Sequence, residues 1–358
     1  MIRLSARLLS AAALVVLSAA AVLAAAQQHV PPAPDSTAAP SAQQPSAPSP
    51  QDQPAAPTPQ DQQSAPPSAP APSGPPVFPK LDPAYFTAST PTADVVNAFL
   101  QANWGYDSDR MWQVQAILKT PADGVSKVIV LFGDKTGKTK PQILLFFSLP
   151  DGKHIIVGED VVLFGDHPFA ENRQILQQRA DGPYRGSAAK DLELVEFADF
   201  QCPHCKAAQA NMEKLLADYP KARIVFQVLP IPSIHPQSVI AAEYGVCVAK
   251  LGGSSAFFQY VASVFDGQDG LATADGATLT LNSAVVKAGL NPSKVAACAA
   301  TPEVKASVDA AIQLGKDLGV NEVPTLAING RMIQANLSYD VLKKIIDYQI
   351  KADGVAGQ

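Results

Sequence analysis

The sequence predicts an α/β protein in which a long, proline-rich N-terminal segment precedes two folded modules. Of the 32 prolines, 17 lie between Pro31 and Pro79, so an ordinary globular composition begins only near residue 77. A helical pattern and four strand-like runs then occupy residues 77–166, and strand and helix patterns alternate from residue 184 onward. The net charge of −5 gives no indication of nucleic-acid binding, and four cysteines are too few for a disulfide-dense scaffold.

Residues 1–26 have the features of an export signal. Arg3 and Arg7 flank the start of an apolar run over residues 8–26, which ends in three alanines, the small-residue pattern that signal peptidase accepts. A run of this length also just suffices to span a bilayer, so a cleaved signal peptide and a retained anchor both remain open. In either case we expect the folded part in the periplasm or cell envelope.

Residues 27–76 consist mainly of Pro, Ala, Ser and Gln without Lys or Arg, which predicts a disordered linker.

Residues 77–166 are predicted to form a small α+β domain. Thr90 and Pro91 favour a helix start, with the threonine as the cap and the proline in the first turn, and the helical stripe stops at Gly105. Four strand-like runs separated by turn sequences follow: Met111–Thr120, Val125–Phe132, Gln142–Leu149 and Lys153–Leu163. No catalytic constellation is present, so we expect this domain to serve dimerisation or substrate contact. Residues 167–183 then predict a connecting helix.

Residues 184–358 are predicted to form the second domain, in the order β-α-β, helical insertion, β-β-α. The first strand pattern runs straight into a pair of cysteines, and an amphipathic helix follows it. The helical insertion covers about residues 236–318. The other predicted elements are the strands Leu192–Phe197, Ala222–Leu229, Thr325–Ile328 and Met332–Gln334 and the helix Tyr339–Lys351.

The chemistry concentrates in Cys202-Pro203-His204-Cys205, where a strand gives way to a helix. Cys202 lies near the helix N-terminus, where unpaired N–H groups and the helix dipole stabilise a thiolate and lower its pKa. His204, when protonated, would add positive charge beside the same sulfur. Cys205 lies one turn further in, should be more buried, and suits the resolution of a mixed disulfide. Pro203 fits the first turn, where its missing N–H has no partner to lose.

Two other interpretations of the cysteine pair stay open. The pair is half of a zinc site if His204 or His235 supplies a third ligand, but structural zinc usually needs four ligands from two paired motifs, and no second Cys-x-x-Cys exists. A purely structural disulfide is the other interpretation, although so short a loop stabilises little.

The second domain resembles the DsbA family of exported thiol–disulfide oxidoreductases, which have a thioredoxin fold. The dipeptide Pro203-His204 between the cysteines is typical of the strongly oxidising members of that family. Glu196, six residues before Cys202, matches the position of the family's buried acid, which helps proton transfer during exchange. An exposed strand carboxylate remains the alternative for Glu196.

A second part of the same resemblance lies more than a hundred residues further on. Val323-Pro324-Thr325 matches the family's cis-proline loop, which packs against the active-site disulfide and presents backbone groups to a substrate strand. The resemblance therefore implies a catalytic role for Pro324 and substrate contacts by Val323, Pro324 and Thr325.

The first domain has a weaker resemblance of its own. The run from Asp151 to Gly158, followed by a helical arm, resembles the N-terminal dimerisation module of the DsbC/DsbG disulfide isomerases. This implies a homodimer formed through residues 77–166.

Cys247 and Cys298 both fall within the helical insertion, 51 residues apart. In an oxidising compartment two thiols in one small domain are more often paired than free, and related DsbA-like proteins often carry a second disulfide in this insertion. We expect a structural disulfide here, with two inert core thiols or a redox relay as the alternatives.

These observations lead to the expectation of an exported thiol oxidase without cofactor or metal. Its expected partners are reduced or misfolded secreted proteins and, as the resemblance implies, a quinone-linked membrane protein that reoxidises it. A dimeric isomerase or reductase and a client-binding chaperone module remain as alternatives.

Overall fold

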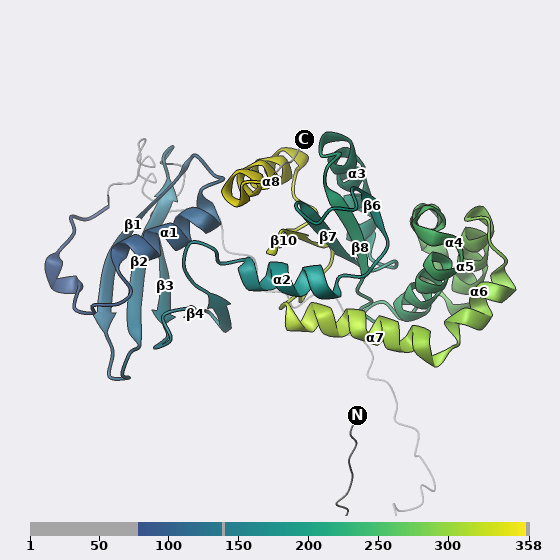
Figure 1. Ribbon diagram of the computed structural model, residues 1–358, viewed down its shortest axis with the longest axis horizontal. Helices are drawn as coiled ribbons and strands as arrows, with labels where there is room; N and C mark the ends of the chain where they lie inside the picture. The colour runs from purple at the N-terminus through teal and green to yellow at the C-terminus, as the bar shows by residue number, and fades with distance from the viewer. Residues whose placement is uncertain (1–77, 138–139, 356–358) are drawn as a thin grey trace, which may run out of the picture. The chain divides into compact units, whose positions relative to one another are not determined.

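The computed structural model describes residues 78–137 and 140–355 (Figure 1). The predicted signal or anchor at 1–26 and the predicted linker at 27–76 lie outside the described residues. Among the residues described, no helix combines the length and the apolarity that a bilayer span requires.

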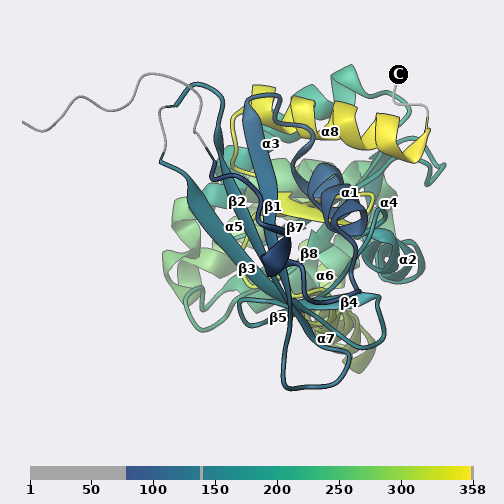
Figure 2. The same cartoon turned by 90° about the vertical axis from the view of Figure 1, so that its left-hand side faces the viewer.

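The first domain is a helix packed on an antiparallel meander (Figure 2). Its sheet has the strand order β1-β2-β3-β4-β5. The helix α1, Ala93–Trp104, buries Val96, Phe99 and Leu100 against the sheet, where the rings of Phe99, Phe146 and Phe164 contact one another. The remaining elements are the 3-10 turn η1, Pro83–Tyr85, and the strands β1, Arg110–Lys119; β2, Ser126–Asp134; β3, Gln142–Ser148; β4, His154–Val157; and β5, Asp160–Leu163.

Two sequence predictions for this domain were wrong in detail. The run Lys153–Leu163 is not one strand but the hairpin β4–β5, because Gly158 takes a positive φ of 61° and reverses the chain there. The helix α1 starts later than expected, because Thr92 rather than Thr90 is its cap. The Thr92 hydroxyl accepts a hydrogen bond from the Val95 N–H at 3.3 Å, and Pro91 lies before the helix.

The second domain is built on a five-stranded mixed sheet with the order β10-β9-β7-β8-β6. Only β7 and β8 pair in parallel; the other neighbours are antiparallel. The strands are β6, Tyr184–Gly186; β7, Glu193–Ala198; β8, Arg223–Val228; β9, Thr325–Ile328; and β10, Arg331–Gln334. The short edge strand β6 was not predicted.

Helices cover both faces of this sheet (Figure 1). The helices α3, Pro203–Asp218, and α8, Tyr339–Asp353, pack on the face that contains Leu194. The helices α2, Ala170–Arg179, and α7, Pro302–Asp317, pack on the face that contains Val195. All six residues of β7 are buried, as expected for a central strand covered on both sides.

The helical insertion lies between β8 and β9. It consists of α4, Ser238–Asp266; η2, Gln268–Ala272; α5, Ala274–Lys287; α6, Pro292–Ala299; and α7. A positive φ of 74° at Gly253 breaks α4 into two segments. The order of elements agrees with the prediction of an α/β domain with a helical insertion, preceded by an α+β domain.

Candidate active site

The end of the buried strand β7 leads directly into the N-terminus of α3, and this junction holds both cysteines of the first pair. Cys202 is the cap residue of α3, with extended backbone angles, and Pro203 occupies the first turn. The carbonyl of Cys202 accepts hydrogen bonds from the N–H groups of Cys205 (3.1 Å) and Lys206 (3.2 Å). The Cys202 sulfur therefore lies at the positive end of the helix.

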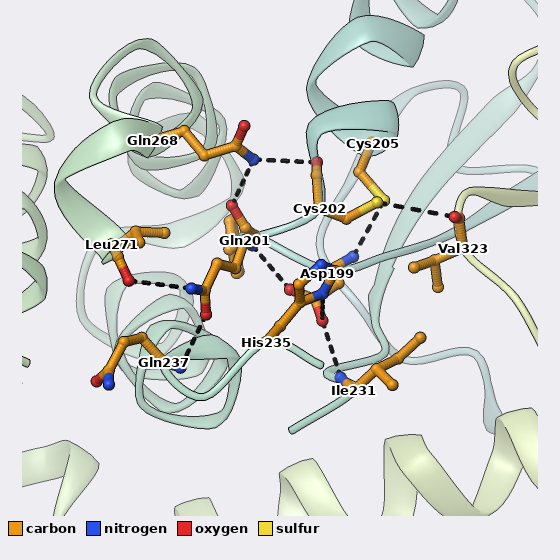
Figure 3. Close-up of polar contacts among 11 residues, drawn as sticks. Asp199, Gln201, Cys202, Cys205, Ile231, His235, Gln237, Gln268, Leu271 and Val323 are labelled. Carbon is orange, nitrogen blue, oxygen red and sulfur yellow. Dashed lines mark hydrogen bonds and ion pairs between the residues drawn. The ribbon is translucent and has the colours of Figure 1, made fainter. Parts of the chain in front are cut away.

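The two cysteines are free thiols in this structure and have opposite electrostatic environments (Figure 3). The pKa of Cys202 is lowered to about 6, first by the hydrogen bond from the Cys205 thiol and then by the backbone N–H groups of Cys205 and His204 and the charge of His235. Burial raises the pKa of Cys205 far above its ordinary value. The exposed fractions are 4% for Cys202 and 0% for Cys205. Cys202 is therefore the thiol that ionises, and Cys205 is the thiol that keeps its proton.

The loop before β9 lies against this pair. The peptide bond Val323–Pro324 is cis, and the Val323 carbonyl oxygen lies 3.8 Å from the Cys202 sulfur. The Thr325 hydroxyl donates to the Glu322 carbonyl (2.8 Å). The structure thus brings the cis bond Val323–Pro324 to Cys202 across more than a hundred residues of sequence, while the side-chain hydrogen bond of Thr325 is with Glu322.

Glu196 lies within β7, six residues before Cys202 in the sequence. Its exposed fraction is 2%, and burial raises the pKa of its carboxyl to about 7. The Gln209 side-chain amide, on α3, donates a hydrogen bond to this carboxyl (2.8 Å). The charge of Glu196 is among the causes that raise the pKa of Cys205, so the two groups interact. A carboxyl that changes protonation near neutrality is suited to exchange a proton with Cys205.

The His204 side chain is exposed, so water screens its charge. Its contribution to the lowered pKa of Cys202 comes through its backbone N–H.

Sequence reasoning did not single out Asp199, which the structure places at the centre of the site. Asp199 is 1% exposed, and its carboxylate accepts from the backbone N–H groups of Gln201 (2.7 Å) and Ile231 (2.8 Å). The same carboxylate lies 2.9 Å from Nδ1 of His235 (Figure 3). The available signal was an acidic residue at the end of a buried strand, three residues before Cys202.

A second set of contacts ties the helical insertion to the exchange site (Figure 3). The Gln268 amide donates to the carbonyls of Phe200 (2.9 Å) and Cys202 (3.0 Å). From the opposite direction, the Gln201 amide donates to the Leu271 carbonyl (3.0 Å). The turn that carries Cys202 is therefore braced by η2.

Cys247 and Cys298 form a disulfide that joins α4 to α6, with their Cα atoms 5.9 Å apart. This bond lies within the core of the helical insertion. Within residues 78–137 and 140–355, no group of three or more His, Cys, Asp or Glu side chains is arranged to hold a metal ion. His235, considered as a zinc ligand, instead contacts Asp199.

Three features together define a class of domain. They are a cysteine pair at a strand–helix junction, a cis-proline loop that faces the pair, and a mixed sheet from which both extend. Residues 178–348 match the family model described as thioredoxin, which spans just under half of the chain. Residues 178–348 therefore form a thioredoxin-like domain, in agreement with the predicted fold class.

Individual proteins that are similar to this chain have more specific names than the family model. The chain is 25% identical over 192 residues to a probable disulfide bond formation protein D of Bacillus cereus, an alignment that covers 52% of this chain and 83% of that protein. It is 36% identical over 91 residues to the Na(+)/H(+) antiporter NhaA 3 of Salinispora tropica, which covers 25% of this chain and only 14% of the antiporter. Among solved structures, the thiol-disulfide exchange protein alpha-DsbA2 from Wolbachia pipientis is 21% identical with a TM-score of 0.43, covering 50% of this chain and 96% of that one.

Proposed function

We propose that this protein is an exported thiol–disulfide oxidoreductase that introduces disulfides into secreted proteins through Cys202 and Cys205. The observation that carries the proposal is the contrast between the two thiols, since the pKa of Cys202 is lowered to about 6 and that of its buried neighbour is raised. The name of the Bacillus cereus relative supports the same activity.

The reaction starts from the disulfide form of the pair. A substrate thiolate attacks the Cys202 sulfur, the Cys202–Cys205 bond breaks, and Cys205 leaves with the electron pair and takes up a proton. Glu196 is placed to supply that proton, because its carboxyl changes protonation near neutrality and interacts with Cys205. A second substrate thiolate then attacks the substrate sulfur of the mixed disulfide, and Cys202 leaves as a thiolate. The substrate gains a disulfide, and the enzyme is left reduced.

The direction of the reaction follows from the same contacts. Stabilising the Cys202 thiolate favours the reduced enzyme over its disulfide, so the disulfide form is a stronger oxidant. A thiolate with a low pKa is also the better leaving group in the second step. Both effects favour oxidation of the substrate.

The substrates in this proposal are reduced or misfolded secreted proteins, and a quinone-linked membrane protein reoxidises the enzyme. The place of action is the periplasm or cell envelope, with residues 8–26 as a cleaved signal or as an anchor. Two copies associate through residues 77–166.

A second candidate function, a dimeric isomerase or reductase, is favoured by the first domain. Its sheet exposes large apolar side chains, among them Ile143 (67% exposed) and Val161 (61% exposed), which suit contact with a misfolded client or a second copy. An isomerase would need the pair to be held reduced.

The deciding experiment is the equilibrium of the Cys202/Cys205 pair with glutathione, combined with two activity assays on the full-length protein. An oxidase shows a strongly oxidising equilibrium and oxidises a dithiol peptide faster than it refolds a scrambled protein. A weakly oxidising equilibrium with the opposite ranking selects the isomerase. Cys202→Ser is the matched control, and any exchange that survives this change contradicts a reaction at Cys202. Client binding that persists in Cys202→Ser, with no exchange in the unmodified protein, would indicate a chaperone module instead.

A further inference from the structure

The polar groups of Asp199 connect both cysteines to a histidine from another segment. Its backbone carbonyl accepts from the Cys202 N–H (3.1 Å), and its backbone N–H donates to the Cys205 sulfur (3.4 Å). Its carboxylate contacts Nδ1 of His235, which lies in the loop between β8 and α4. His235 is therefore linked to the exchange site by a single, fully buried residue.

These contacts determine how the His235 ring is oriented. A carboxylate only accepts hydrogen bonds, so Nδ1 of His235 carries a proton and donates to Asp199. The backbone N–H of His235 also donates to the Ile231 carbonyl (2.9 Å), which holds the loop in place. Because 85% of the His235 side chain is covered and Asp199 is buried, the ring has one orientation and little water around it.

We propose that His235, oriented by the Asp199 carboxylate, is a positioning residue that supplies positive charge beside Cys202 and thereby sets how strongly oxidising the cysteine pair is. This inference rests on the proposed function, because it concerns the thiol exchange at the same site. The sequence suggested that His204 adds positive charge beside Cys202. Part of that role belongs to His235, which lies outside the Cys-x-x-Cys motif.

The comparison of the two histidines supports this assignment. The His204 side chain is exposed, where solvent and salt screen its charge. His235 is only 15% exposed in its side chain, and its charge is among the causes that lower the pKa of Cys202. A cation held in a poorly hydrated site acts more strongly on a neighbouring thiolate than one in water.

The test separates the charge of His235 from its shape. His235→Asn keeps an N–H that can donate to Asp199 but removes the charge, whereas His235→Lys keeps the charge. We expect the pKa of the Cys202 thiol, followed by thiolate absorbance, to rise by about one unit in His235→Asn and to return toward the original value in His235→Lys. The equilibrium constant for oxidation of glutathione by the protein disulfide should fall about tenfold in His235→Asn.

His167→Asn is the matched control, since the side chain of this histidine is 75% exposed and pairs with Asp166, away from the cysteines in the sequence. It should leave both readouts unchanged. His235→Gln provides a second neutral variant if His235→Asn does not fold.

The inference is overturned if a folded neutral variant, Asn or Gln, keeps the thiol pKa and the glutathione equilibrium of the unmodified protein. It is also overturned if the Lys and neutral variants shift both readouts equally, because a role in packing alone would do so. The proposed function fails differently: in that case the unmodified protein itself does not exchange with glutathione.

Discussion

The two cysteine pairs of this protein have opposite surroundings and different states: the first pair consists of free thiols, and the second forms a disulfide. Cys202 caps the N-terminus of α3, where backbone N–H groups face its sulfur. Cys247 lies in the interior of α4, and Cys298 lies one residue before the C-terminal end of α6, where the helix dipole disfavours an anion. Two residues separate the cysteines of the first pair, which lies at the junction of a strand and a helix. The second pair joins two helices within a core.

The difference teaches that helix position and burial, rather than the presence of two cysteines, separate a reactive pair from a structural one. At the first pair one thiol is stabilised as an anion and its neighbour is kept protonated. At the second pair no such asymmetry is required, because the bond has only to hold α4 and α6 together.

The largest effect is expected from Cys205→Ala. Without the second thiol, Cys202 stays nucleophilic but cannot release a bound substrate by internal attack, so mixed disulfides should accumulate on Cys202. Non-reducing electrophoresis with an oxidised client measures this. The double variant Cys247→Ala/Cys298→Ala serves as the control and should accumulate none; adducts in both proteins would show that trapping is not specific to the first pair.

Removal of the second disulfide should act on stability and leave exchange unchanged. In the chain-entropy treatment, a loop of this length contributes about 4 kcal/mol to the free energy of unfolding. Cys247→Ala/Cys298→Ala should lose roughly that amount in denaturant titration. Its glutathione equilibrium should match that of the unmodified protein, and a large change there would mean that the second pair takes part in redox chemistry.

Glu196→Gln should change how stability depends on pH. Burial raises the pKa of Glu196 in the folded protein to about 7, so the folded state retains a proton that the unfolded state loses near pH ~4.3. The native protein therefore loses stability as pH rises between these two values, and the loss is complete above pH ~7. The variant lacks this loss, so its free energy of unfolding relative to the unmodified protein should increase by roughly 3 kcal/mol from pH ~4 to pH ~8. A constant difference between the two proteins across this range would contradict a buried, proton-retaining carboxyl.

A smaller effect is expected from Gln268→Leu, which cuts the contacts between the helical insertion and the turn of Cys202. The Phe200 carbonyl loses its donor, and leaving a buried acceptor unpaired costs about 1–3 kcal/mol. The Cys202 carbonyl loses one donor but keeps the N–H groups of Cys205 and Lys206. Gln259→Leu, at an exposed position of α4, is the matched control. Equal melting temperatures for the two variants would show that these hydrogen bonds do not brace the turn.

Much of the fold was predictable because its signals are local. The strand pattern before Cys202, the amphipathic helix after it and the turn at Asn329-Gly330 each lie within a few residues of sequence. β6 escaped prediction because three residues are too few to show alternation, and it is recognised only by its pairing with β8. The division of β4 from β5 depended on the single backbone angle at Gly158.

The residues of the exchange site also differ in whether a local sequence signal predicts them. Cys202 and Cys205 are conspicuous in the sequence because of their spacing, and Val323-Pro324-Thr325 was found through a family resemblance. Asp199 and His235 are 36 residues apart, and no periodicity relates them. Their contact depends on how the loop after β8 folds back over the end of β7, which only a three-dimensional structure shows.

The ionisation of Cys202 tests the central claim most directly. Thiolate absorbance of the reduced, full-length protein should rise with a midpoint near pH 6, the value to which the surroundings lower the pKa of Cys202, and Cys202→Ser should abolish that rise. A midpoint near pH ~8.5, where an ordinary cysteine ionises, would contradict the account.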